Sequence, residues 1–233
     1  MIERERVVAA LASVIDPELD EPITTLRFVS SVTITSQGDV EVRLRLPTPQ
    51  CAPNFAFLMA ADARRALLEL ADVGRVRVLL EDHYTGAEIN AALERGEGFS
   101  GAFPGETDDG ELQSLRELFM RKALLARQAH VAQALLGEGA GERALATLRV
   151  RDLPDSAQAR RCLELRARLG LPCAPSAPAF VRPDGEAVPV DQFERWLRTG
   201  RLVATSLEAN GGMCRSLLAF RHNQTPDREE VML

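Results

Sequence analysis

Cys51 is the residue with the clearest potential for chemistry. It lies between a predicted strand that ends near Leu46 and a predicted helix that begins near Pro53. Unpaired N–H groups and the positive end of a helix dipole stabilise a thiolate at such a position, and the thiolate is the form that binds metal ions or attacks electrophiles. A free cysteine can equally serve as a small buried hydrophobic residue. Position alone therefore leaves both interpretations of Cys51 open.

Three further polar residues are expected at the same edge of a sheet as Cys51. Parallel strands end at one edge, which brings His83, after the third predicted strand, to the side of the Cys51 loop. The first strand is antiparallel to the second, so the loop after Asp16 and Glu18 lies there too. This set suits iron or zinc, and would also serve a thiol nucleophile with a histidine base. Alternatively, the carboxylates belong to a turn and His83 is a surface residue.

The elements that position these residues are predicted from the spacing of apolar side chains. The expected order is helix, strand, strand, helix and strand, at residues 3–15, 28–35, 40–46, 53–71 and 75–80. Gly38 supplies the turn of an antiparallel hairpin between the first two strands. The second and third strands are expected to be parallel, because a helix joins them in a right-handed crossover.

A change in composition beyond residue 84 predicts a second region. Glycine-rich and acidic residues over 85–110 are typical of a linker with a short helix. Residues 111–233 are expected to be mainly α-helical with a short hairpin near Gly185. The predicted fold is α/β (α+β): an N-terminal α-β-β-α-β domain with a three-stranded mixed sheet at 1–84, followed by a mainly helical C-terminal region.

Composition disfavours several classes of function. The chain has 233 residues, of which 45% are hydrophobic and 27% charged, as in soluble globular proteins. A net charge of -6 disfavours nucleic-acid binding, which requires phosphate neutralisation. The charged N-terminus does not resemble a signal peptide, and no stretch is long and apolar enough to span a membrane. We therefore predict a cytoplasmic protein that binds neither nucleic acid nor membranes.

The cysteines are expected to be thiols. The chain has four, none of which forms a C-x-x-C pair: Cys51, Cys162, Cys173 and Cys214. A closed zinc-finger site is therefore not expected, and disulfides are rare in a reducing compartment.

The ordered motifs of residues 5–82 resemble the SufT/PaaD-like family. They are Asp-Pro-Glu-Leu at 16–19, Ile-Thr-Thr-Leu at 23–26, the hairpin, Cys51, and the helix and strand that follow. The resemblance implies that Cys51 is the functional cysteine and that Asp16 and Glu18 belong to its site. It also implies a role in assembling iron–sulfur clusters or delivering them to client enzymes.

The sequence departs from the pattern of that family at three positions. Arg27 stands where the family carries a glycine, and Pro47 where it carries a threonine. In addition, Ala52 separates Cys51 from Pro53, whereas the family has proline directly after the cysteine. These departures affect the detailed geometry of the loop, while the order of the motifs is retained.

The rest of the chain is similar to a longer variety of this family that occurs with bacterial di-iron monooxygenases of the propane or phenol type. The similarity lies in residues 82–83, 88–90, 103–105, 121–128 and 210–215. It implies the maturation of a metal-dependent oxygenase.

Cys214 is a second candidate for chemistry. It follows two glycines, which allow close approach of the backbone, and Arg215 adds a positive charge beside it. We expect it in the first turn of a helix that opens at Met213. The alternative is a buried helical cysteine above Leu217 and Leu218.

Three functions follow from these residues, and we favour the first. It is an assembly or metal-delivery factor, not an enzyme, that holds iron or an iron–sulfur cluster transiently for a client metalloenzyme or other assembly proteins. Its expected ligands are Cys51, Cys214, Asp16, Glu18 and His83, with Cys214 contributed by the second region or by a second subunit of a homodimer. The second is an interaction module that docks a client oxygenase without metal. The third is a thiol enzyme with Cys51 as nucleophile and His83 as base.

Overall fold

The computed structural model describes residues 2–106 and 108–222. The chain divides into two compact units, the first formed by residues 1–114 and 209–233 and the second by residues 115–208. The first unit thus combines the N-terminal half of the chain with its C-terminal end. The domain boundaries at 84 and 110, which rest on composition, stay predictions.

Unit 1 is built on a three-stranded mixed sheet with the strand order β3-β4-β5. β3 (Val29–Ile34) is antiparallel to β4 (Val40–Arg45), and β4 is parallel to β5 (Val76–Glu81). Gly38 has a φ of 85° in the turn between β3 and β4, a conformation that favours glycine. The predicted α-β-β-α-β order and the mixed sheet are confirmed.

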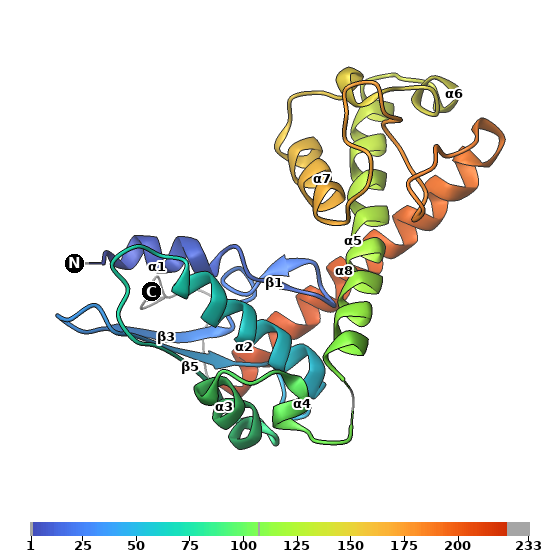
Figure 1. Ribbon diagram of the computed structural model, residues 1–233. Helices are drawn as coiled ribbons and strands as arrows, with labels where there is room; N and C mark the ends of the chain where they lie inside the picture. The colour runs from blue at the N-terminus through green and yellow to red at the C-terminus, as the bar shows by residue number, and fades with distance from the viewer. Residues whose placement is uncertain (1, 107, 223–233) are drawn as a thin grey trace. The chain divides into compact units, whose positions relative to one another are not determined.

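Helices α1 (Arg4–Leu11) and α2 (Pro53–Leu68) pack with this sheet in unit 1 (Figure 1). Their apolar faces and the inward side chains of the strands form one core, with Val7, Leu11, Val42, Leu44 and Leu67 at its centre. Because alternate residues of β4 point into this core, its other face carries charged side chains. β4 is therefore half-buried, at the position predicted for the second strand.

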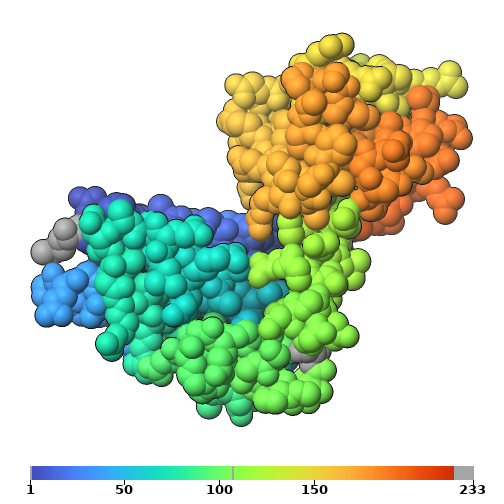
Figure 2. Space-filling view, viewed as in Figure 1, coloured from blue at the N-terminus to red at the C-terminus, as the bar shows by residue number. Residues whose placement is uncertain are grey.

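The first helix is shorter than predicted. It ends at Leu11, and after a turn at residues 12–13 the chain forms β1 (Ile15–Asp16), which pairs in antiparallel register with β2 (Glu21–Pro22). Beyond the sheet, α3 (Gly86–Arg95) and α4 (Phe99–Ala102) complete unit 1. The green atoms of α3 and α4 lie directly beside the cyan atoms of α2 in the space-filling view (Figure 2).

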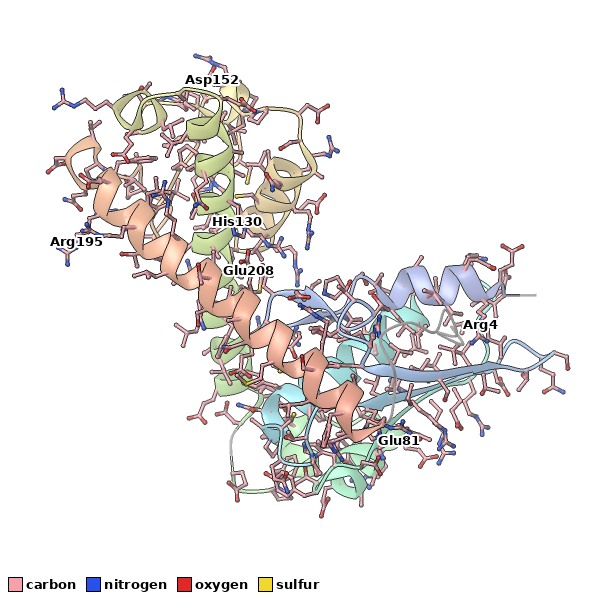
Figure 3. The ribbon with its side chains drawn as sticks, turned by 180° about the vertical axis from the view of Figure 1, so that it is seen from behind. Arg4, Glu81, His130, Asp152, Arg195 and Glu208 are labelled. Carbon is pink, nitrogen blue, oxygen red and sulfur yellow. The ribbon has the colours of Figure 1, made fainter. Side chains whose placement is uncertain are left out.

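Unit 2 is helical, as predicted. Its elements are the greater part of α5 (Asp109–Gly137), α6 (Glu142–Leu145), the 3-10 helix η1 (Val150–Asp152), α7 (Ala157–Arg168), the 3-10 helix η2 (Val190–Gln192) and the first half of α8 (Phe193–Arg221). Ser156 caps α7 by accepting a hydrogen bond from the Ala159 N–H. His130 on α5 lies 3.3 Å from Glu208 on α8 (Figure 3). A bridge between Val181 and Ala187 closes the predicted hairpin.

The helix α8 is continuous, and the prediction that a helix opens at Met213 is wrong. It extends over 29 residues and includes both Gly211 and Gly212. Glycine disfavours a helix interior by about 1 kcal/mol, but Leu218 on the following turn is buried in the core of unit 1. Cys214 consequently lies inside a helix, and the N-terminal helix dipole expected to activate it is absent at that position.

Two glycines of α8 are expected to respond in opposite ways to alanine. A Cβ at Gly212 would meet no atom within 4 Å, so Gly212→Ala should raise the free energy of unfolding by about 0.5–1 kcal/mol through helix propensity. A Cβ at Gly200 would lie 2.7 Å from the Ala129 Cβ, so Gly200→Ala should lower the stability by about 1–2 kcal/mol through overpacking. Urea denaturation followed by circular dichroism measures the free energy of unfolding of both variants. Changes of the same sign and size in the two would contradict the prediction.

In the part of the chain that the structure describes, no helix has the length and apolar character needed to cross a membrane.

Candidate functional site

Cys51 lies in the turn that leads from β4 to α2. The helix begins at Pro53, as predicted, with Ala52 as its N-cap. The thiol is half-buried, packs against the core of unit 1, and its Sγ lies 3.5 Å from the Thr48 Oγ1. The Cys51 N–H also donates to the Thr48 carbonyl, at 3.4 Å. Cys51 is thus held by its own turn, with part of its surface accessible.

His83 contacts the backbone of Cys51 and not its thiol. The His83 Nε2 lies 2.7 Å from the Cys51 carbonyl oxygen, and the Nδ1 accepts a hydrogen bond from the Thr85 N–H, at 3.3 Å. Because Nδ1 is an acceptor, the proton is on Nε2 in the neutral ring, and Nε2 donates to Cys51. Both ring nitrogens therefore have partners, and binding of a metal ion or a thiol proton by His83 would require one of these bonds to break.

Asp16 is buried and organises the turn that follows β1. Only 6% of its surface is exposed, and its Oδ1 accepts hydrogen bonds from the Glu18 N–H at 2.8 Å and the Leu19 N–H at 2.9 Å. Burial raises the pKa of Asp16 to about 6, against the opposing effect of these two bonds. The turn role considered for Asp16 is thus present in the structure, and the carboxyl group is also one that readily accepts a proton near neutral pH.

The end of α8 brings Cys214 to this group of residues. Burial raises the pKa of the Cys214 thiol to about 11, with smaller contributions from the negative charges of Asp16, Cys51 and Glu18. Cys51 and Cys214 also pack against the same core. Asp16, Glu18 and Cys51 therefore lie within electrostatic reach of the Cys214 thiol. We call Asp16, Glu18, Cys51 and Cys214 the thiol–carboxylate cluster.

Two arginines of α8 fix the helix to this part of unit 1. Arg215 forms an ion pair with Glu21 on β2. Arg221 Nη1 donates to the carbonyl oxygens of Leu46 at 3.3 Å and Pro47 at 3.0 Å, in the segment that leads to Cys51. Sequence reasoning missed Glu21 and Arg221, because nothing local to either residue indicates a partner so distant along the chain.

The cluster is not a preformed metal site. Within residues 2–106 and 108–222, no group of three or more His, Cys, Asp or Glu side chains is arranged to hold a metal ion. The types of donor nevertheless suit iron, which is bound by thiolates and carboxylates. An iron–sulfur cluster or an iron ion could bind here only if these side chains moved closer together or if another chain supplied further ligands.

Comparison with known proteins identifies the family of unit 1. The family described as iron-sulfur cluster assembly protein matches residues 4–79. An uncharacterized protein of Methanocaldococcus jannaschii is 31% identical over 97 residues, which are 42% of this chain and 100% of that protein. The chain belongs to the iron–sulfur cluster assembly family. No solved structure matches it.

The assembly family covers part of the candidate site. The matched residues extend from the start of α1 into β5, and they include Asp16, Glu18 and Cys51. His83 and Cys214 lie beyond the match. Three members of the thiol–carboxylate cluster therefore lie within the family match, and Cys214 lies on α8, outside it.

The backbone conformation of Arg27 is one that favours glycine, the residue that the SufT/PaaD-like pattern has at this position. It has a φ of 62°, in the left-handed region. The Phe28 N–H donates to the Ile23 carbonyl and the Arg27 N–H to the Thr24 carbonyl, which is the Schellman arrangement with Arg27 at the position that usually carries glycine. The Schellman turn thus forms in this chain with arginine at the left-handed position.

Replacing Arg27 with glycine is expected to stabilise unit 1. The left-handed conformation disfavours a residue with a Cβ by about 1–2 kcal/mol, and part of this gain is offset by the greater freedom of glycine in the unfolded chain. Arg27→Gly should therefore raise the free energy of unfolding by about 0.5–1 kcal/mol in urea denaturation. Arg27→Ala, which keeps the Cβ, is the control and should show no such gain.

Proposed function

We propose that the chain is a SufT/PaaD-like factor that assembles iron or an iron–sulfur cluster and delivers it to a client metalloenzyme in the cytoplasm. The client we propose is a di-iron monooxygenase, on the basis of the sequence resemblance beyond residue 82. The proposal is supported by the packing of Cys51 and Cys214 against the same core of unit 1, together with the electrostatic effect of Asp16 and Glu18 on the Cys214 thiol.

Cys51 is proposed as the first ligand of the iron. It lies two residues before the first residue of α2, where the helix dipole favours a negatively charged sulfur. His83 is proposed to act as a positioning residue, because its Nε2–H holds the Cys51 carbonyl and its Nδ1 is already occupied. The loop that carries the thiol is thereby fixed from the end of β5.

Cys214 is proposed as a second thiol that becomes available only when iron is present. Its raised pKa keeps the sulfur protonated at neutral pH in the free protein. A metal ion displaces the proton of a thiol, so iron binding at Cys214 would release one proton to solvent. When one chain supplies few strong ligands, coordination positions of the iron stay open for ligands from a client or a second subunit. Such a site suits the transfer of iron to a client.

Anaerobic reconstitution with ferrous iron tests the proposal. Wild type is compared with Cys51→Ser and Cys214→Ser, and with Cys162→Ser and Cys173→Ser, whose thiols lie in unit 2. We expect Cys51→Ser to retain about tenfold less iron after desalting and to activate a client oxygenase correspondingly less, since loss of one strong ligand costs at least about 1.4 kcal/mol. Equal iron content in wild type and Cys51→Ser, with equal activation, would exclude this function.

An interaction module without metal is the second candidate, and one observation favours it. Met213, Leu217 and Phe220 lie at helical spacing on α8 and are 63%, 40% and 84% exposed. Exposed apolar side chains on one face of a helix are typical of protein contacts. If a client oxygenase co-purifies with the chain and this persists in Cys51→Ser, while no variant changes the iron content, the docking role alone is supported.

The thiol enzyme is less well supported by the geometry. A general base must lie within hydrogen-bonding reach of the proton it removes. The His83 ring is directed to the carbonyl oxygen of Cys51, and its second nitrogen accepts from Thr85. No hydrogen bond joins the His83 ring to the Cys51 thiol among the described contacts, so we do not propose this activity.

A further inference from the structure

A groove of about 430 Å³ follows the outer edge of β5 in unit 1, away from the thiol–carboxylate cluster. The strand forms one wall with residues 75–79, and α3 forms the other wall with Asn90, Leu93 and Glu94. Arg64 of α2 adds a further side chain. β5 is an outer strand of the sheet, because the order is β3-β4-β5. We call this feature the β5 groove.

Backbone groups of β5 are directed into this groove. The Val40 N–H donates to the Arg75 carbonyl at 2.8 Å, and Val40 is the register partner of Val76. In a parallel ladder this means that the backbone groups of Arg75 and Arg77 point to β4, while those of Val76 and Val78 point outward. A strand edge with unpaired N–H and C=O groups is a template for another strand.

Leu80 is the next residue of β5 whose backbone N–H and C=O point outward, and it shows how such groups can be paired. The Leu80 N–H donates to the Asn90 Oδ1 at 2.8 Å, and the Asn90 Nδ2 donates to the Leu80 carbonyl at 3.1 Å. The side-chain amide of Asn90 thus takes the place of a neighbouring strand at Leu80. It closes one end of the edge, while the outward backbone groups of Val76 and Val78, which line the groove, have no equivalent partner within residues 2–106 and 108–222.

The groove also carries an excess of positive charge in an acidic protein. Three arginines line it, Arg64, Arg75 and Arg77, against one acidic residue, Glu94. Arg77 lies 3.5 Å from Glu41. The guanidinium groups of Arg64 and Arg75 have no ion-pair partner among the described residues. Because the whole chain has a net charge of -6, this local excess is not a consequence of composition.

We propose that the β5 groove binds an acidic, extended segment of a partner protein as an added strand of the sheet. The outward backbone groups of Val76 and Val78 would pair with the backbone of the segment, as in other cases of β-strand addition. Arg75 and Arg77 lie on one face of β5, so carboxylates at alternate positions of the segment would reach them. The proposal is independent of the cysteine chemistry.

A labelled peptide binding assay tests the charge requirement. The probe is an acetylated and amidated hexapeptide of alternating Glu and Val with a fluorescent label, added to the full chain. The double variant Arg75→Glu with Arg77→Glu should bind it at least about tenfold more weakly, because both proposed attractive pairs become repulsive. Arg65→Glu is the matched control, since Arg65 is exposed on α2 and does not line the groove, and it should bind as wild type.

Two isomeric probes test the strand pairing. One hexapeptide is N-methylated at its first, third and fifth residues and the other at its second, fourth and sixth, so that only one of them loses the N–H groups that face β5. We expect binding of one isomer to fall at least about tenfold and that of the other to stay unchanged. Hydrogen exchange of Val76 and Val78 should also slow when the unmodified probe is bound. Equal binding of the two isomers, or wild-type affinity in the double arginine variant, would overturn the proposal.

Discussion

Replacing Gln128 with methionine is expected to lower the free energy of unfolding of unit 2 by about 2–4 kcal/mol. Gln128 is only 2% exposed, and its side chain pairs with both backbone groups of Val181. Its Oε1 accepts from the Val181 N–H at 2.7 Å, and its Nε2 donates to the Val181 carbonyl at 3.1 Å. Methionine has a similar volume but no hydrogen-bonding groups of comparable strength, so a buried N–H and a buried C=O would be left unpaired, at about 1–3 kcal/mol each.

The matched control for this prediction is Gln133→Met. Gln133 lies on the same helix, α5, but is exposed, so its replacement should change the stability by no more than about 0.5 kcal/mol. Urea denaturation followed by circular dichroism compares the two variants with wild type. The role assigned to Gln128 would be refuted by a Gln128→Met protein that unfolds at the same urea concentration as the control.

The regular elements of unit 1 could be predicted because their signals are local. Alternating apolar and charged residues identify β4, and the crossover rule gives its parallel pairing with β5. The pair β1 and β2 was missed because each strand has two residues, too few for any periodicity. α8 was divided wrongly because Gly211 and Gly212 are a strong local signal for a helix end, which the packing of Leu218 in the core overrides.

The candidate site could be predicted in part. The position of Cys51 directly before α2 is local and was predicted, whereas the approach of Asp16 and Glu18 to Cys51, expected from strand order, stays a prediction. The approach of Cys214 depends on how the last part of α8 packs in unit 1, and no local pattern encodes such a contact. The orientation of His83 is likewise tertiary, since its partner is a backbone carbonyl and any residue could supply one.

Asp16→Asn is expected to stabilise the metal-free protein at pH 7 while weakening its hold on iron. Burial raises the pKa of Asp16 from 3.8 to about 6, so the folded protein binds a proton more tightly than the unfolded chain does. Stability therefore falls as the pH rises from about 4 to about 6, by up to about 3 kcal/mol, and the loss persists at neutral pH. Asparagine is neutral throughout this range, and its Oδ1 can still accept from Glu18 and Leu19.

The measurement is urea denaturation of wild type and Asp16→Asn at intervals from pH 4 to pH 8. In the variant, the free energy of unfolding should fall much less between pH 4 and 6 than in wild type. At pH 7 the variant should be more stable than wild type by about 1–3 kcal/mol. Asp72→Asn, which replaces an exposed carboxyl group, should keep the wild-type decline. If the stability of Asp16→Asn also falls between pH 4 and 6 as in wild type, burial of the Asp16 carboxylate is not the cause of that fall.

Iron retention then separates the two roles of Asp16. A residue that only fixes the turn after β1 can be replaced by asparagine without loss of iron, since both turn hydrogen bonds survive. A residue that also supplies negative charge to iron at Cys51 and Cys214 cannot, because the amide is a neutral and weaker ligand. A protein that is more stable and yet loads less iron would show that this buried carboxylate is retained for its charge, at the expense of the fold that contains it.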